Sequence, residues 1–227
     1  MDASKRATNY LAIIGDIRRS RSAPQRAELQ KRLEEGLSAV NENFRNVIAA
    51  GFVITLGDEF QGLLSRPEEV VGVMAALDSA VGGEVAIRYG LGWGPVSTEL
   101  REFALGMDGP CFHNAREAVA ASKRADRWAT ASGFGADDEI LNGVLWLVGA
   151  ARARWTAVQR QTVEQVRAAR TQREVAAARG VHESSVSQAL KAALHEPVLA
   201  AERSAEVLLE RHGDRSGSNE DTGEVTT

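Results

Sequence analysis

The sequence predicts an α/β (α+β) sandwich followed by an all-α domain of the helix-turn-helix type. Short apolar strands alternate with amphipathic helices over residues 8–132. Residues 136–169 favour helix and contain no proline, so we expect a long linking helix region. Residues 170–211 hold two short helical segments around a glycine, as helix-turn-helix domains do. The polar, acidic residues 212–227 should form a disordered tail.

The first half of the sandwich is predicted to contain three strands and one helix. Apolar runs of four to six residues bounded by glycine or aspartate indicate the strands, and leucines recurring at helical spacing indicate the helix. The expected elements are a strand at 10–14, a helix from Pro24 to about Phe44, a strand at 51–56, a Gly57-Asp58 turn and a strand at 60–64.

The second half repeats this alternation. Ser65 can cap a helix whose first turn contains proline and acids, and Gly82-Gly83 would end it. A glycine-broken, strand-rich stretch follows at 84–98. We then expect a helix at about 113–123 and a short strand near 128–131.

Composition excludes several classes of protein. The chain has 227 residues, a net charge of −4 and a mean hydropathy of −0.23, which is ordinary globular composition. No apolar run approaches the roughly 18 residues that a membrane span needs, and we see no signal peptide. The single cysteine, Cys111, cannot form an internal disulfide. These features predict a cytoplasmic protein without membrane association.

Charge is unevenly distributed along the chain. Residues 151–195 carry eight Lys and Arg against three Glu, whereas the segments on either side are acidic. A clustered basic segment is the usual electrostatic footprint of nucleic-acid binding. The alternative is a solvated helix face, and charge alone does not separate the two.

Two aspartates follow predicted strands at points where the backbone leaves the sheet. Asp16 comes directly after the first apolar strand, and Asp58 lies in the predicted hairpin turn. Two such carboxylates brought together would bind Mg²⁺ or Mn²⁺ through hard oxygen ligands. Alternatively, Asp16 caps the following turn and Asp58 is an ordinary turn residue.

Three sequence blocks resemble the bacterial SatD family. They are Ile13-Ile14-Gly15-Asp16-Ile17, then Ile54-Thr55-Leu56-Gly57-Asp58-Glu59-Phe60-Gln61-Gly62, and Gly106-Met107-Asp108-Gly109-Pro110 with Ala115-Arg116. The resemblance covers about residues 8–125. The same region is similar to class III nucleotidyl cyclase domains, because Arg88-Tyr89-Gly90-Leu91-Gly92-Trp93-Gly94-Pro95-Val96 matches their glycine-rich strand. This resemblance implies a ferredoxin-like, palm-type cyclase sandwich.

The cyclase resemblance also implies site residues. It assigns a Mg²⁺ or Mn²⁺ ion to Asp16 and Asp58, and a purine nucleotide to Ile17, Gly57, Arg88 and Arg116. Arg116 would be catalytic if the domain is an active cyclase. Two positions depart from the cyclase pattern: Ile54 replaces a base-reading lysine, and Phe112 replaces a helix asparagine, with Asn114 nearby. These departures argue against an active enzyme.

The basic segment contains a helix-turn-helix spacing. Thr171 and Glu174 form a capping box, in which each side chain satisfies a free backbone N–H at a helix start. Gly180 supplies the turn, while Val181, Val186 and Leu190 should fill the core between the helices. The pattern resembles the DNA-binding module of many bacterial regulators. Its second helix, at about 183–194, would be the recognition helix.

The residues expected to contact double-stranded DNA are polar and on the outer face. Short hydroxyls suit phosphates, glutamine suits adenine, and lysine suits phosphate or guanine. The predicted set is Arg173, Ser184, Ser185, Ser187, Gln188 and Lys191. Arg179 would flank the DNA backbone. The alternative is a helical hairpin used only for dimerisation.

Three functions remain open at this stage. The first is a homodimeric DNA-binding transcriptional regulator whose SatD/cyclase-like domain senses a metal-bound nucleotide. The second is a nucleotidyl cyclase or related phosphoryl-transfer enzyme with a DNA-binding appendage. The third is a DNA-binding protein whose cyclase-like domain only dimerises. A seam for the homodimer is expected on Trp155, Val158, Val163 and Val166.

Overall fold

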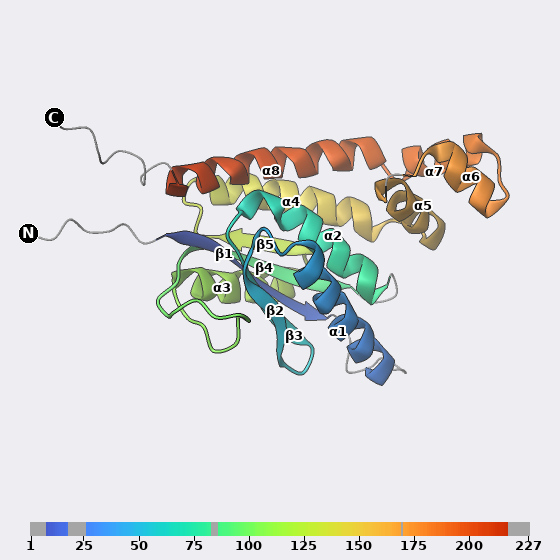
Figure 1. Cartoon of the computed structure of the whole chain (residues 1–227). Helices are drawn as coiled ribbons and strands as arrows, with labels where there is room; N and C mark the ends of the chain where they lie inside the picture. Colours follow the sequence, from blue (N-terminus) through green and yellow to red (C-terminus); the bar gives the residue numbers. More distant parts are fainter. Residues whose placement is uncertain (1–7, 18–25, 83–85, 169, 218–227) are drawn as a thin grey trace, which may run out of the picture.

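The computed structural model describes residues 8–17, 26–82, 86–168 and 170–217. Pro24, where the first helix was expected to begin, and the tail from residue 218 lie outside these ranges. The described chain has a mixed five-stranded sheet covered by helices, with further helices at one end (Figure 1). This confirms the predicted α/β architecture.

The sheet and its first two helices follow a β-α-β-β-α-β order. The strand order is β2-β3-β1-β4-β5, with β5 parallel to β4 and the other neighbouring pairs antiparallel. The elements are β1 (Asn9–Ile17), α1 (Arg26–Asn43), β2 (Ile48–Leu56), β3 (Glu59–Leu64), α2 (Val70–Val81), β4 (Ile87–Pro95), α3 (Pro110–Ala125) and β5 (Ala129–Ser132). A 3-10 turn at Pro67–Glu69 precedes α2, and Ser65 does not cap it, because its hydroxyl donates to the Val47 carbonyl.

One face of the sheet carries the main hydrophobic core. Leu11 and Ile13 of β1 pack there with the apolar stripe of α1 and with α2. The predicted period of α1 is confirmed, because Leu29, Leu33, Leu37 and Val40 are all buried. Alternate residues of β1 face the opposite side, as a strand requires.

The second face is covered by α3, which lies unusually close to β4. On this strand the residues that face α3 after Arg88 are glycines. A Cβ built on Gly90 would lie 2.1 Å from the Ala115 carbonyl oxygen, and one on Gly92 would lie 2.0 Å from that of Cys111. The glycine-rich strand therefore lets the α3 backbone touch the sheet, which fixes the height of every α3 side chain above the strands.

Cys111, the second residue of α3, is buried against the sheet. Burial raises the pKa of its thiol to about 11. Because the thiolate is the reactive form, we expect Cys111 to be inert in the native protein at pH 8 and to react rapidly in denaturant. Titration with Ellman's reagent measures this, and fast modification of the native protein would contradict the described burial.

The region 136–169 contains two helices rather than one continuous helix. These are α4 (Asp137–Ala153) and α5 (Ala157–Arg167). The chain turns between them because Trp155 is buried, donating its ring N–H to the Ala193 carbonyl, while Thr156 begins α5 with its own capping box. The expectation of a long linking helix is therefore wrong at this corner.

Three further helices complete the described chain: α6 (Gln172–Arg179), α7 (Glu183–Ala192) and α8 (His195–Gly217). In Figure 1, α8 runs back along α4, while α5, α6 and α7 form a unit at the other end. The predicted disorder is wrong for residues 212–217, which continue α8. His212 fixes this end of the helix through a 2.8 Å contact of Nε2 with the Asp137 carboxylate. Within the described ranges, no helix is long and apolar enough to cross a membrane.

Candidate functional site

Three charged side chains form a row across one end of the sheet. Asp16 on β1 lies directly opposite Glu59 on β3 and Arg88 on β4. Directly opposed residues of antiparallel strands project from the same face. Ala12 and Ile14, which precede Asp16 on this face, pack against α3. The row therefore places two carboxylates and one guanidinium on the α3 side.

Helix α3 brings two cations over the carboxylates. Lys123 Nζ lies 2.8 Å from Asp16 Oδ1 and 3.8 Å from Glu59 Oε2. Arg116 Nη1 lies 3.7 Å from Glu59 Oε1. The two cations are about two helical turns apart, so both project from one face of α3. The structure thus joins the predicted Asp16 and Arg116 through a residue, Glu59, that the sequence reasoning did not select.

The predicted hairpin turn lies beside this cluster. Gly57 has a φ of 65°, the left-handed conformation that the turn requires, and an added Cβ would meet nothing within 4 Å. The Asp58 carbonyl accepts a hydrogen bond from the Ile17 N–H at 3.4 Å, which ties the turn to the end of β1. The Ile17 side chain is buried on the opposite face, so only its backbone can contribute to a site here.

Arg88, which was predicted to bind a nucleotide, is paired with Asp126. Its Nη2 donates to Asp126 Oδ1 at 2.7 Å, and its buried Nε has no hydrogen-bond partner among the described residues. The guanidinium therefore reaches past β4 toward the end of α3. The other three predicted nucleotide-binding residues, Ile17, Gly57 and Arg116, lie near Asp16.

The two residues that depart from the cyclase pattern, Ile54 and Phe112, pack in the hydrophobic cores. Ile54 is half-buried beside the main core, and Phe112, on α3 itself, is buried between that helix and the sheet. Asn114 does not replace the missing asparagine at the cluster, because its Nδ2 donates to the Trp93 carbonyl at 2.8 Å. Its amide thus fastens α3 to β4.

The donor set at this end fits a hard divalent cation only in part. Asp16 and Asp58 would supply carboxylate oxygens, the ligand type that Mg²⁺ and Mn²⁺ prefer. Among the described residues, no group of three or more acidic, histidine or cysteine side chains is arranged to hold a metal. Lys123 already satisfies Asp16. A metal would therefore have to compete with the ammonium group and take further oxygens from a ligand.

Sequence reasoning missed Glu59 and Lys123. Glu59 adjoins Asp58 in the Gly-Asp-Glu turn, so the turn itself carried a signal. Lys123 lies seven residues after Arg116, and this spacing puts both on one helix face. Only the close packing of α3 on β4 shows that this face meets the carboxylates.

The helices α5, α6 and α7 form one packed unit. Their small core contains Val163, Val175, Val186 and Leu190, together with Trp155. The predicted capping box is confirmed, because Thr171 N donates to Glu174 Oε2 at 2.8 Å and Glu174 N donates to Thr171 Oγ1 at 3.2 Å. Because α5 shares this core, the unit includes residues N-terminal to the expected start at residue 170.

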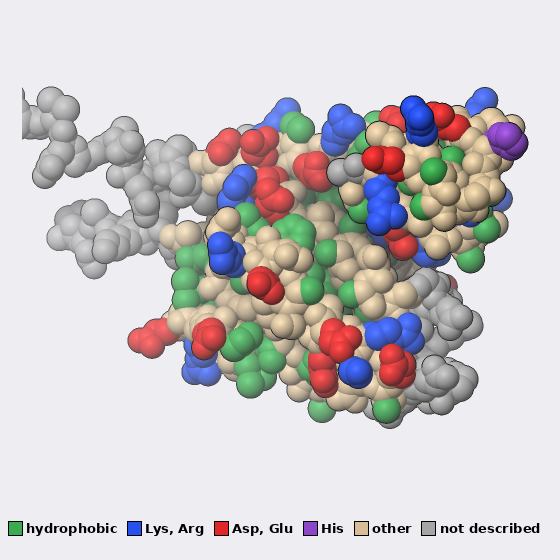
Figure 2. Space-filling model, turned by 45° about the vertical axis from the view of Figure 1, so that its right-hand side comes forward, with side chains coloured by type: hydrophobic (Ala, Val, Ile, Leu, Met, Phe, Trp, Pro, Cys, Tyr) green, Lys and Arg blue, Asp and Glu red, His purple; other side chains and the backbone are tan. Residues whose placement is uncertain are grey.

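The polar residues predicted to contact DNA all lie on the surface of this unit. Val186 and Leu190 hold one side of α7 in the core, so the rest of that helix faces outward. Exposed side chains comprise Arg173, Ser184, Ser185, Ser187, Gln188 and Lys191. Figure 2 shows basic and acidic side chains alternating over the face of this unit that is turned forward.

Three details of the helical unit differ from expectation. Val181 is 42% exposed and so does not fill the core between the helices. Arg179 turns inward and donates to the Thr162 hydroxyl, which removes it from the expected DNA-flanking position. Trp155 and Val163 are buried within the chain, so they cannot form a seam between two chains.

Comparisons with solved structures find a likeness of fold. One is the dimeric guanylyl cyclase domain of the RhoGC fusion protein from the aquatic fungus Blastocladiella emersonii, at 20% identity and a TM-score of 0.37, covering 51% of this chain and 75% of that one. Another is the catalytic core of a rhodopsin-guanylyl cyclase with converted specificity in complex with ATPαS, at 19% identity and a TM-score of 0.37, covering 53% and 76%. No curated protein matches the chain.

The family comparison covers far more of the chain than the cyclase domains do. The model of the SatD family matches residues 10–209, which include the sheet, the charged cluster and the helical unit. The family thus spans both the α/β part and the helices that follow it. The chain belongs to the SatD family.

Proposed function

We propose that this SatD-family protein is a DNA-binding transcriptional regulator whose cyclase-like domain senses a metal-bound nucleotide. The observation that carries the proposal is the placement of α7. Its apolar residues Val186 and Leu190 are buried, while the hydroxyls, amide and amine predicted to meet DNA are exposed. This division of faces suits a helix that is held by a core and enters the major groove.

The chemistry of the exposed α7 residues supports DNA as the partner. Ser184 and Ser185 lie in the first turn of α7, where short hydroxyls can reach phosphates or base edges. Gln188 follows about one turn later and Lys191 about two turns later. Residues 151–195 carry a surplus of five positive charges, which favours a polyanion.

The charged cluster supports a nucleotide as the sensed ligand. Arg116 and Lys123 supply cations for phosphate oxygens, and Asp16 with Asp58 supplies carboxylates for Mg²⁺ or Mn²⁺. When bound, the metal would neutralise phosphate charge and hold the phosphates against the sheet end. Lys123 would then leave Asp16 and pair with the phosphates. Ile54 and Phe112 are apolar, so they cannot replace the base-reading lysine and the helix asparagine of the cyclase pattern. This favours binding of the nucleotide over its conversion to a product.

The DNA-binding half predicts a specific loss on substitution. Lys191→Ala should reduce affinity for duplex DNA across sequences and lower the salt slope by about one, because one phosphate contact is lost. Gln188→Ala should cost about 1 kcal/mol on the preferred sequence and less on others. Fluorescence anisotropy on duplexes selected by the protein from a random pool measures both.

Lys31→Ala is the matched control for this series. Lys31 is 68% exposed on α1, far along the chain from the helical unit, and pairs only loosely with Glu35. Its loss should leave DNA affinity unchanged. If Lys191→Ala and Lys31→Ala bind DNA equally well, the proposed recognition helix is wrong.

The nucleotide half is tested with ATP and GTP in the presence of Mg²⁺ or Mn²⁺. Calorimetry should detect binding to the wild type and not to Asp16→Ala or Asp58→Ala. Mass spectrometry of the same mixtures should find unchanged nucleotide. A cyclic or linear product made by the wild type and not by Asp58→Ala would instead show a phosphoryl-transfer enzyme.

We also propose a homodimer, since paired recognition helices suit palindromic sites, and light scattering measures the oligomeric state.

A further inference from the structure

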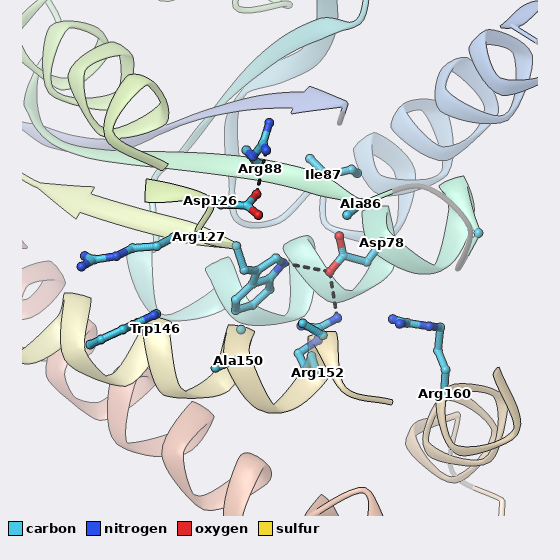
Figure 3. A pocket seen from close by; sticks show the side chains of 14 residues that line it. Asp78, Ala86, Ile87, Arg88, Asp126, Arg127, Trp146, Ala150, Arg152 and Arg160 are labelled. Carbon is cyan, nitrogen blue, oxygen red and sulfur yellow. Dashed lines mark hydrogen bonds and ion pairs between the residues drawn. The ribbon is translucent and has the colours of Figure 1, made fainter. Parts of the chain in front are cut away.

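A cavity of about 220 Å³ lies between the sheet and the helical unit (Figure 3). Its walls come from β4, α2, the α3–β5 connection, α4 and α5. Four arginines line it: Arg88, Arg127, Arg152 and Arg160. Neither Asp16 nor Asp58 lines it, so it is a second site rather than part of the first.

The cavity carries more positive charge than its own acids can balance. Asp78 and Asp126 are its only acidic lining residues within the described chain. Asp78 binds Arg152 at 2.8 Å, and Asp126 binds Arg88 at 2.7 Å. The Arg160 side chain makes no hydrogen bond or ion pair within the described part of the chain, whereas its backbone N–H donates to the Thr156 carbonyl. Among the lining side chains the surplus is about two positive charges; Glu202, 4.0 Å from Arg152 Nη1, and Glu164, whose charge acts on Arg160, adjoin the site from outside the lining. A concave site with such a surplus favours an anionic ligand.

Aromatic stacking holds two of the arginines in fixed orientations. The Arg152 guanidinium lies 4.4 Å from the centre of the Trp128 ring, and that of Arg127 lies 4.9 Å from the Trp146 ring. A guanidinium stacked on a ring keeps its N–H groups directed outward in its own plane. Stacking therefore prepares these donors for an acceptor at little further loss of side-chain freedom.

Charge, donor geometry and volume together select the ligand class. Planar guanidinium forks match phosphate oxygens through paired hydrogen bonds. The volume is below the range of about 300–1,000 Å³ that is usual for drug-sized ligands, so a whole nucleotide would not be enclosed. We propose that this cavity binds a diphosphate group, either as a free small anion or as the terminal part of a larger ligand.

Such a ligand would join the two parts of the protein. Arg152 projects from α4, which packs against β5, whereas Arg160 projects from α5 in the helical unit, and their guanidinium groups point toward each other in Figure 3. An anion held by Arg152 and Arg160 would fasten α5 to α4 beside the sheet. Binding at this site could thus change the position of the helical unit independently of the charged cluster around Asp16.

The test uses inorganic pyrophosphate in the presence of EDTA, which removes the metal needed by the carboxylate site. Calorimetry should detect binding to the wild type and at least a tenfold loss in Arg160→Gln. Intrinsic fluorescence should change on binding, because Trp128 and Trp146 line the cavity. Arg154→Gln is the matched control, since Arg154 is exposed at the same α4–α5 corner without lining the cavity. Its affinity should equal that of the wild type.

Further arms separate the sources of the diphosphate and the two sites. Tighter binding of ADP or GDP than of pyrophosphate would identify a nucleotide as the bearer, and weaker binding a free anion. Asp58→Ala should bind pyrophosphate normally even if it loses metal-dependent nucleotide binding, so the two proposals fail separately. Arg88→Lys keeps the charge and should lose affinity through its poorer geometry. Absence of wild-type binding up to about 10 mM pyrophosphate, or equal binding by Arg160→Gln, would overturn the assignment.

Discussion

Gly92→Ala is expected to destabilise the protein by about 3 kcal/mol, the upper end of the range for inserting an atom into a packed interior. The added Cβ would lie 2.0 Å from the Cys111 carbonyl oxygen and 2.2 Å from the Ala115 nitrogen. Both contacts are with helix backbone, which cannot turn aside as a flexible side chain can. Relief requires α3 to move away from β4.

The control for this substitution is Gly143→Ala. Gly143 lies inside α4, and a Cβ built on it meets nothing within 4 Å. Alanine there should stabilise the protein by about 0.5–1 kcal/mol, since it restricts the unfolded chain and favours helix. Urea denaturation followed by circular dichroism compares the two variants. Equal stability of Gly92→Ala and the wild type would show that α3 does not contact the sheet as described.

Movement of α3 would also change the charged cluster. Lys123 and Arg116 are carried by this helix, and their distances from Asp16 and Glu59 depend on its height above the sheet. Gly92→Ala should therefore weaken metal–nucleotide binding even in conditions where the variant remains folded. The same substitution thus connects the packing of the sheet with the function proposed for its end.

Asp78→Ala is expected to cost about 3–5 kcal/mol, the range for breaking a buried ion pair from one side. Asp78 accepts hydrogen bonds from Tyr89 Oη at 3.0 Å and from Trp128 Nε1 at 3.1 Å, besides its ion pair with Arg152. Burial raises the pKa of Asp78, and Arg152 opposes that shift. Removing the carboxylate leaves a guanidinium that is only 11% exposed without this partner.

The remaining partner of Arg152 cannot compensate fully. Glu202 Oε1 lies 4.0 Å from Arg152 Nη1, whereas Glu202 Oε2 is held by Arg167 at 2.6 Å. Thermal and urea unfolding measure the loss, with Glu35→Ala as the control. Glu35 is 66% exposed and pairs with Lys31 on the surface, so its loss should change stability by less than about 0.5 kcal/mol. A similar small effect of Asp78→Ala would show that the pair is not buried in solution.

Local patterns in the sequence predicted much of the fold. Short apolar runs bounded by glycine or aspartate indicated β1 and β3, and the Thr171–Glu174 capping box indicated the start of α6. Such signals depend on residues within a few positions of one another. They could not show that α8 continues to residue 217, because its end is held by the contact of His212 with Asp137, 75 residues away.

The candidate site illustrates the same limit. Asp16 and Asp58 stand out because each follows an apolar run, and Arg116 because of the family resemblance. The expectation that the backbone leaves the sheet at Asp16 is wrong, because β1 continues to Ile17 and pairs Asp16 with Glu59 and Arg88. Lys123 gave no such signal, because its role depends on the register that puts Asp16 opposite Glu59 and on the glycines that admit α3. The corner at Trp155 is a similar case, since the tryptophan is fixed by the distant Ala193 carbonyl.

The most direct test of the proposed regulator is the effect of nucleotide on DNA affinity. Fluorescence anisotropy would compare wild-type binding to its selected duplex with and without saturating ATP or GTP and Mg²⁺. We predict a change of at least about fivefold, the lower range of measured coupling between sites, and its absence in Asp58→Ala. Unchanged DNA affinity in the presence of a nucleotide that calorimetry shows to be bound would contradict the account.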